Sequence, residues 1–279
     1  AEKARQDFQQ SQVNQIRKHT THNSASQPKD TIINGFILSD LLIPIRDIKY
    51  GGVQKDDIPA IDNPTFTKIE NIDYLSDNDL LLIVNKENYI KAFPLKILTR
   101  HEIVNDQHII ITYCPLCHSG IVFDISQMEN KSSFGVSGLL YQSDVLMYDR
   151  KTNSLWSQIE SKAIAGPLSG TTLDIIPSSY ISWKDLKINY PDARILDAPG
   201  NIKSRYDQPL YTQYRKSDRL MFPVNHRNAT LPNKTEVLGI TLENKSVAIP
   251  IKKIMEAKDG VKYIIANSIL TARFDNGEF

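Results

Sequence analysis

The chain has 279 residues, a length that suits one large domain or two modest ones. Apolar residues make up 41% and charged residues 23%, as in ordinary globular proteins, and the formal net charge is +1. This balance gives no electrostatic sign of nucleic-acid binding, and no apolar run reaches the ~20 residues that a membrane-spanning helix needs.

Residues 1–30 form a polar segment rich in Gln, Asn, Ser, Thr and Lys, with little apolar periodicity. We therefore predict a flexible arm or tether. The chain begins with Ala1, which fits a removed signal peptide as well as a trimmed sequence. We expect an extracytoplasmic protein, and a lipid anchor ahead of the arm would attach it peripherally to a membrane.

From residue 31 onward, short apolar runs alternate with turn residues such as Tyr50-Gly-Gly and Gly166-Pro. Short strands at this spacing predict a β-rich α+β fold, for which we expect two lobes. The first lobe covers residues 31–230 and carries both cysteines of the chain. The second, shortened lobe covers residues 231–279.

An internal repeat is the basis for the two lobes. Residues 82–96 are similar to residues 238–252, with a Glu-Asn pair, an Ala and a Pro in equivalent places. Each copy predicts a hairpin with a Glu-Asn turn, then a short helix that Pro94 or Pro250 opens, then a further strand. We predict a duplicated β-hairpin–short helix–strand unit; the alternative is a chance similarity of two hairpins.

The cysteines lie in the run Cys114-Pro-Leu-Cys117-His118, between apolar, β-branched segments that predict a strand-to-strand turn. Their spacing is too short to join distant parts of the fold. Both thiolates can chelate a soft metal ion, with His118 as a third ligand. The same spacing allows a reversible disulfide. It is also the attachment pattern of c-type haem, although that motif normally opens into a helix. The remaining alternative is that both thiols pack as small apolar groups.

A second candidate group is His101-Glu102, directly after a short helix predicted from Pro94 onward. If this helix continues, both residues lie about one turn beyond Leu98, on the same side. An adjacent His and Glu can perform acid–base chemistry or bind a metal, and they can equally form a buried hydrogen-bonded pair. Asn105 stands where a zinc-protease helix would have its second histidine, which excludes that motif.

A third group is a series of polar residues among aromatics, which predicts the wall of a pocket. Its members are Ser137, Tyr141, Asp144, Met147, Asp149, Arg150 and Gln158. The alternative is an Asp149–Arg150 salt bridge with ordinary turn chemistry. Leu139 replaces the closing glycine of a nucleophile elbow, so a serine hydrolase has little support.

Several motifs, in order along the chain, resemble a known family. They include Ala92-Phe-Pro-Leu-Lys-Ile-Leu, His101-Glu-Ile-Val-Asn-Asp, Thr112-Tyr-Cys-Pro-Leu-Cys, Met147-Tyr-Asp-Arg and Trp156-Ser-Gln. This set of motifs resembles that of the bacterial and archaeal family catalogued as domain of unknown function 3179. The resemblance implies an exported, often lipid- or membrane-attached protein without an assigned activity. It also implies a common site that contains His101, Glu102, Cys114, Ser137, Asp144, Asp149, Arg150 and Gln158.

We therefore predict an extracytoplasmic binding protein with a copper site at Cys114, Cys117, His118 and His101, which Met147 or His226 would complete. A carboxylate in place of the thioether would favour zinc. The rival hypotheses are a dithiol oxidoreductase or other enzyme that uses the His101, Glu102 and Cys114 pocket, an accessory subunit of a larger complex, and a c-type haem protein. The partner would be a small ligand or another protein.

Overall fold

The structure of the chain is a computed structural model that describes residues 31–86, 89–128, 132–200, 206, 208–243, 245–275 and 277. The chain divides into two units, Ala1–Thr31 and Ile32–Phe279, and nearly all described residues belong to the second. The predicted arm at residues 1–30 lies outside the described residues. So do Glu87, Asn88 and Asn244, which belong to the predicted Glu-Asn turns of the repeat.

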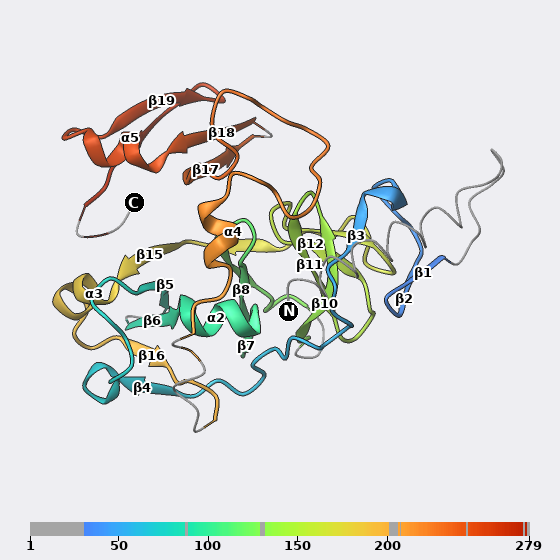
Figure 1. Ribbon diagram of the computed structural model, residues 1–279, viewed down its shortest axis with the longest axis horizontal. Helices are drawn as coiled ribbons and strands as arrows, with labels where there is room; N and C mark the ends of the chain where they lie inside the picture. The colour runs from blue at the N-terminus through green and yellow to red at the C-terminus, as the bar shows by residue number, and fades with distance from the viewer. Residues whose placement is uncertain are drawn as a thin grey trace. The chain divides into compact units, whose positions relative to one another are not determined.

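One five-stranded sheet carries the first hairpin of the predicted repeat (Figure 1). Its strands, in spatial order, are β15 (Ser178–Ser182), β5 (Leu80–Lys86), β6 (Tyr89–Pro94), β16 (Arg194–Leu196) and β4 (Phe66–Lys68). The pair β16–β6 is parallel and the other pairs are antiparallel. Short helices follow strands of this sheet directly, namely α2 (Leu95–His101) after β6, α3 (Trp183–Asn189) after β15 and the 3-10 helix η2 (Ile69–Asn71) after β4.

A four-stranded antiparallel sheet carries the cysteines. Its strands, in spatial order, are β14 (Asp174–Ile176), β9 (Ser119–Asp124), β8 (Ile109–Cys114) and β7 (Ile103–Asp106). All six residues of β8 are buried, which explains its continuous apolar run. The β8–β9 hairpin ends with the pair Cys114 and Ser119, so the cysteine motif lies at the tip of this sheet.

A second five-stranded sheet supplies the opposite wall of the candidate site. Its strands, in spatial order, are β13 (Lys162–Ala165), β12 (Leu155–Ser157), β11 (Asp144–Asp149), β10 (Phe134–Tyr141) and β3 (Ile48–Tyr50). A β-bulge interrupts the β10–β11 register between Val136 and Leu139. Gly138 lies within this bulge at φ +72, and a Cβ there would lie 2.2 Å from the carbonyl oxygen of Val53. The preceding segments are β1 (Thr31–Ile33), β2 (Phe36–Leu38) and the 3-10 helix η1 (Ile45–Asp47).

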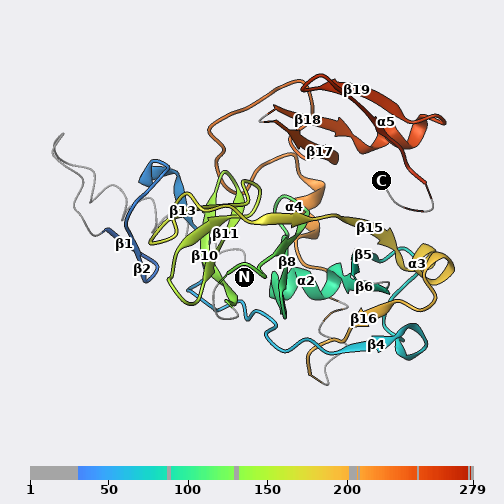
Figure 2. The same cartoon turned by 180° about the vertical axis from the view of Figure 1, so that it is seen from behind.

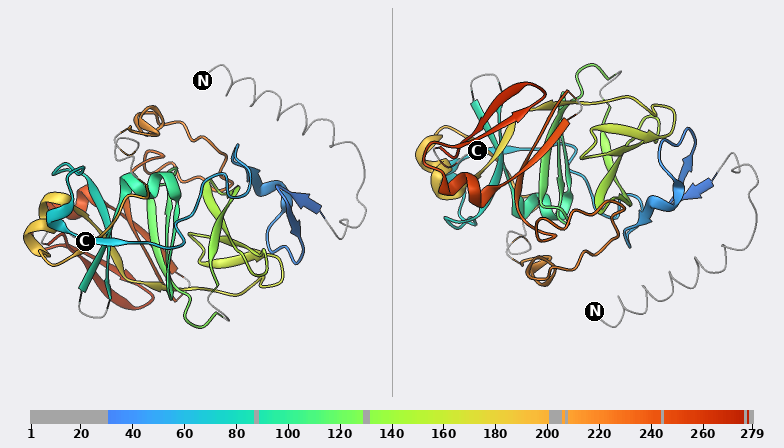
Figure 3. Two further views of the ribbon diagram at one scale, coloured as in Figure 1. Left: turned by 90° about the horizontal axis from the view of Figure 1, so that it is seen from below. Right: turned by 90° about the horizontal axis from the view of Figure 1, so that it is seen from above.

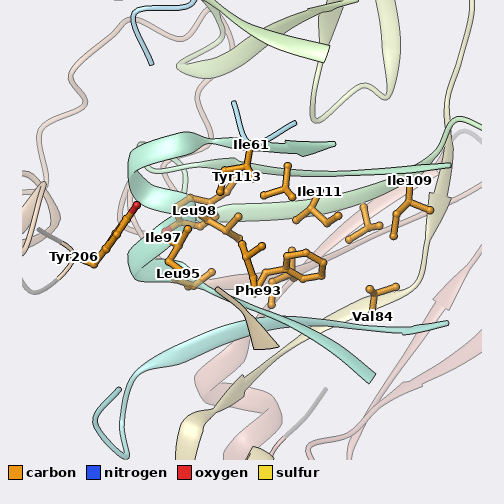
Figure 4. Packing of buried hydrophobic residues seen from close by; sticks show 14 residues of the cluster. Ile61, Val84, Phe93, Leu95, Ile97, Leu98, Ile109, Ile111, Tyr113 and Tyr206 are labelled. Atoms are coloured by element: carbon orange, nitrogen blue, oxygen red, sulfur yellow. The ribbon is translucent and has the colours of Figure 1, made fainter. Parts of the chain in front are cut away.

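A hydrophobic cluster joins α2 to the two sheets that flank it. Figure 4 shows Leu98 of α2, Phe93 of β6 and Ile111 and Tyr113 of β8 packed together. These four side chains are completely buried, and burial of each large apolar side chain contributes about 1.5–3 kcal/mol. The cluster therefore fixes the C-terminal end of α2 next to the tip of the cysteine sheet.

The C-terminal part consists of α4 (Thr212–Lys216), two separate hairpins and α5 (Ile251–Glu256), in orange to red in Figure 3. The hairpins are β17 (Val237–Leu242) with β18 (Lys245–Pro250) and β19 (Val261–Ile265) with β20 (Ser268–Ala272). Pro250 pairs with Val237 and caps α5, just as Pro94 pairs with Leu81 and caps α2. The two hairpin–helix segments thus have the same local geometry, whereas their origin by duplication and the lobe boundary at residue 231 stay predictions.

The predicted β-rich α+β class is confirmed, because strands dominate and the helices are few and short. In the part of the chain that the structure describes, none of the helices has the length and apolar character needed to cross a membrane.

Candidate functional site

The cysteine motif forms the turn between β8 and β9, as the sequence predicts. Strand β8 ends at Cys114, residues 115–118 form the turn, and β9 begins at Ser119. His118 closes the turn with a left-handed backbone at φ 57. The turn holds the two cysteines on one short loop, at the edge where the cysteine sheet meets the β10–β11 hairpin.

The two thiols have different environments, and both are free. Cys114 is 1% exposed, and its burial raises the pKa of its thiol well above the ordinary value of 9.0. The neighbouring Cys117 thiol and the Asp144 carboxyl raise this pKa further. Cys117 is exposed, and its Sγ lies 3.0 Å from Ser119 Oγ. The site therefore combines one sheltered and one accessible thiol.

Asp144, the first residue of β11, brings a carboxyl group to the thiols from the other sheet. Its Oδ1 accepts a hydrogen bond from Cys117 Sγ at 3.1 Å, and its Oδ2 accepts one from the Ile159 N–H at 3.1 Å. Burial raises the pKa of Asp144 to about 6, although these hydrogen bonds lower it. One potential ligand atom from each of Cys114, Cys117 and Asp144 lies within 4.8 Å of the other two.

Glu102 adds a second buried carboxyl group beside this cluster. Helix α2 ends at His101, and Glu102 follows with φ 57 and ψ −30, so the condition for placing both residues on one helical face, that the helix continues through Glu102, is not met. Glu102 is 7% exposed, and no described residue forms a hydrogen bond with its carboxyl group. Burial and, to a smaller extent, the charge of Asp144 raise the pKa of Glu102 to about 8.

Glu102 and Cys114 line the same cavity, of about 80 Å³. The other walls come from the cysteine loop, the segment before β4, the β10–β11 hairpin and residues 211–222. They comprise Gly51, Val53, Ile58, Pro115, Leu116, Val136, Gly138, Leu139, Leu140, Val145, Tyr211, Met221 and Phe222. The cavity is thus largely apolar, with one thiol and one carboxyl group in its wall.

A hydrogen-bond network fixes the base of the cysteine loop. Ser119 Oγ donates to Gln158 Oε1 at 2.9 Å, and Gln158 Nε2 donates to Thr112 Oγ1 at 2.8 Å and to the Ser119 carbonyl at 3.3 Å. Gln158 and Thr112 are completely buried. Gln158 therefore lies near the cysteines, where it positions the loop through Ser119.

The structure does not bring the two predicted histidine ligands into the thiol–carboxyl group. His118 Nδ1 lies 3.4 Å from the Glu236 carboxylate, and its ring lies near the rings of Tyr113 and Tyr180, with centroids 6.0 and 5.9 Å away. Burial and then the charge of Arg215 lower the pKa of His118.

The imidazole of His101 is likewise engaged. Its Nδ1 lies 2.7 Å from the Pro59 carbonyl oxygen and its Nε2 lies 3.0 Å from the Tyr206 hydroxyl. Among the described residues, the group that can hold a metal consists of Cys114, Cys117 and Asp144, without either histidine.

Three other predicted pocket residues take part in structural hydrogen bonds. Ser137 Oγ donates to the Leu146 carbonyl and accepts from Leu139 N–H at 3.0 Å, which stabilises the bulge. Asp149 accepts hydrogen bonds from Thr152 N–H at 2.6 Å and from Trp156 Nε1 at 3.1 Å. Arg150 Nη1 forms an ion pair at 2.6 Å with Asp62, where the sequence suggested Asp149.

The last two predicted pocket residues pack in hydrophobic clusters. Met147 is completely buried against Trp156, and Tyr141 packs, half-buried, against the cluster around Leu139 and Leu146. His226 is exposed. None of the three lies in the thiol–carboxyl group.

Two residues near the site, Tyr211 and Arg215, were not among the candidates that the sequence suggested. Helix α4 lies beside the end of β8 (Figures 1 and 2), where Arg215 Nη2 lies 3.3 Å from the Tyr113 hydroxyl. Tyr211 and Phe222 line the cavity. No periodicity marks the sequence around Tyr211 and Arg215, and the only available signal there was a concentration of tyrosines.

The comparisons with known proteins concern the family of the chain. A family model described as "Protein of unknown function (DUF3179)" matches residues 55–277, which is well over half of the sequence. No curated protein and no solved structure matches the chain. The matched region contains Glu102, both cysteines and Asp144. The chain therefore belongs to the DUF3179 family of proteins of unknown function.

Proposed function

We propose that this protein binds a metal ion at Cys114, Cys117 and Asp144. The observation that carries the proposal is the approach of two thiol sulfurs and a carboxylate oxygen to within 4.8 Å of one another. Donors bonded at ~2.3 Å to one tetrahedral ion lie about 3.8 Å apart. Small rotations of the three side chains would therefore bring them to bonding distance.

The charge of the site also favours a cation. The pKa values of Cys114, Asp144 and Glu102 are all raised, mainly by burial. In the described part of the chain, no lysine or arginine is among the groups that shift these three pKa values. Buried acidic groups without a cation stay protonated, and a metal ion that displaces their protons restores charge balance.

The donor set favours zinc over the copper that the sequence suggested. Copper was expected because two thiolates with imidazole or thioether donors suit Cu(I). The carboxylate of Asp144, which lies close to both thiols, would be the third donor, and it is a harder ligand that suits Zn(II). Haem attachment has less support, because Cys114 is buried and its sulfur would have to reach the edge of a porphyrin.

Metal binding can be measured with two variants and a matched control. We expect the purified protein to take up one Zn(II) per chain in native mass spectrometry. Cys114→Ser/Cys117→Ser should abolish this uptake and Asp144→Asn should weaken it at least tenfold. Asp174→Asn removes an exposed carboxylate of β14 and should leave it unchanged. Equal zinc uptake by the double variant and the wild type would contradict the proposal.

The accessible Cys117 beside the sheltered Cys114 favours dithiol–disulfide exchange as a second candidate function. In this reaction the Cys117 thiolate attacks a substrate disulfide and releases one thiol. Cys114 then attacks Cys117 Sγ and releases the second thiol, so the protein is oxidised as the substrate gains two electrons and two protons. Asp144, hydrogen-bonded to Cys117, is placed to accept a proton. Titration with glutathione disulfide should then yield an intramolecular disulfide at a defined potential; mixed disulfides alone would exclude this function.

The cellular location belongs to the same proposal. The family resemblance supports an extracytoplasmic protein, and the family itself is confirmed. Cell fractionation of the native producer should find the protein outside the cytoplasm. If it were recovered only from the cytoplasm, this part of the proposal would fail.

A further inference from the structure

The cavity next to the thiol–carboxyl cluster has features that the metal centre alone does not use. Three of the cavity's apolar side chains, Leu139, Val145 and Phe222, come from the β10–β11 hairpin and the segment after α4. Its polar wall contains Glu102 and the Cys114 thiol. The volume of about 80 Å³ corresponds to room for roughly five to eight water-sized groups.

Glu102 is the residue that points to a ligand. Its side chain is more than nine-tenths buried, it lines the cavity, and no described residue forms a hydrogen bond with its carboxyl group. It lies outside the group of metal donors. A buried polar group without a partner destabilises a fold, and a ligand that supplies the missing hydrogen bond removes this penalty.

We propose that this cavity binds a small neutral molecule whose N–H or O–H group donates a hydrogen bond to the Glu102 carboxyl oxygen. The oxygen accepts such a bond whether the carboxyl group is protonated or ionised. The apolar body of the molecule packs against Leu139, Val145 and Phe222. A short-chain primary amide has the right size and polarity.

The apolar wall determines that the ligand is neutral. A cation would lose its hydration against Leu139, Val145 and Phe222, which offer it no polar partner. An anion would meet the carboxyl group of Glu102 and the apolar wall. The size of the ligand and its hydrogen-bond donor follow from the cavity and Glu102 alone.

The test uses isobutyramide and its isostere 3-methylbutan-2-one, in which a methyl group replaces the NH₂ group. Both are titrated into the zinc-loaded chain labelled with ¹³C at the methionine methyl groups. Met221 lines the cavity and reports binding, whereas the exposed Met255 of α5 is the control. We expect a saturable shift of the Met221 signal with isobutyramide. The ketone should bind about tenfold more weakly, because it lacks the donor to the buried carboxyl group.

Two variants connect this preference to Glu102. Glu102→Gln keeps an acceptor oxygen and should retain the preference for the amide, whereas Glu102→Leu should abolish it. If Glu102→Leu does not fold, the comparison of amide and ketone in the wild type still decides. Equal affinities for the two probes, or an unmoved Met221 signal at saturating concentration, would overturn the inference.

The failure of this inference can be distinguished from that of the metal proposal. Zinc content is measured by mass spectrometry on each titrated sample. A zinc-free protein that still prefers the amide would refute the metal centre. It would still support the hydrogen bond from the ligand's N–H group to Glu102. Tighter binding of isopropylammonium than of isobutyramide would overturn the neutral charge of the ligand.

Discussion

Replacing Glu102 with Gln should change how the stability of the metal-free protein depends on pH. The carboxyl group has an ordinary pKa of 4.5, and burial raises it to about 8 in the folded chain. Between these values the folded protein holds a proton that the unfolded chain has lost, so stability falls as the pH rises. Glu102→Gln cannot ionise, and its stability should not show this loss.

The magnitude follows from the two pKa values. At about 1.4 kcal/mol for each pKa unit, the change from 4.5 to about 8 corresponds to about 4–5 kcal/mol in total. About 2–3 kcal/mol of this loss falls between pH 6 and pH 8. Asp144, whose pKa is raised to about 6, loses its own contribution mostly below this window. The interval from pH 6 to pH 8 therefore reports mainly on Glu102.

Urea unfolding at pH 6, 7 and 8, with chelator present, measures this difference. The free energy of unfolding of the wild type should fall across the series by about 2 kcal/mol more than that of Glu102→Gln. Glu160→Gln changes an exposed carboxylate and should behave like the wild type. Parallel pH profiles for the wild type and Glu102→Gln would refute the assignment of a buried, protonated carboxyl group at residue 102.

Three further predictions follow from the same contacts. Asp149→Ala should lower the free energy of unfolding by about 2–4 kcal/mol in urea titrations, because it leaves the buried Trp156 Nε1 without its acceptor; a loss below 0.5 kcal/mol would be inconsistent with this role. Gly138→Ala should lower the melting temperature much more than Gly35→Ala, since both positions have positive φ but only Gly138 lacks space for a Cβ. Zinc binding at pH 7 should release about two protons, detected as a dependence of the calorimetric enthalpy on the buffer, because both thiols lose their protons; an enthalpy independent of the buffer would argue against thiolate ligation.

The position of the cysteine turn was predictable because its signals are local. Apolar, β-branched residues before Cys114 and after Ser119 require two strands, and the short interval between them leaves room only for a turn. The short helix after Pro94 was predictable for the same reason. Its end was not, because Glu102 adopts a left-handed backbone that residues of its type rarely take.

The composition of the candidate site was only partly predictable. Asp144 was among the expected pocket residues, but its contact with Cys117 depends on how two separate sheets meet, which no local pattern encodes. His118 was expected as a ligand because it follows Cys117 directly. At the end of the turn, however, its side chain lies near Tyr180 and Glu236. Adjacency in sequence therefore does not by itself bring His118 into the group formed by Cys114, Cys117 and Asp144.

X-ray absorption spectroscopy of the zinc-loaded protein tests the central claim most directly, because it reports the atoms bound to the metal. The proposed centre predicts two sulfur donors at about 2.3 Å and oxygen donors at about 2.0–2.2 Å. Asp144→Asn should change the oxygen shell and leave the two sulfur donors in place. A spectrum with only nitrogen and oxygen donors would show that Cys114 and Cys117 do not bind the metal, and it would contradict the proposed centre.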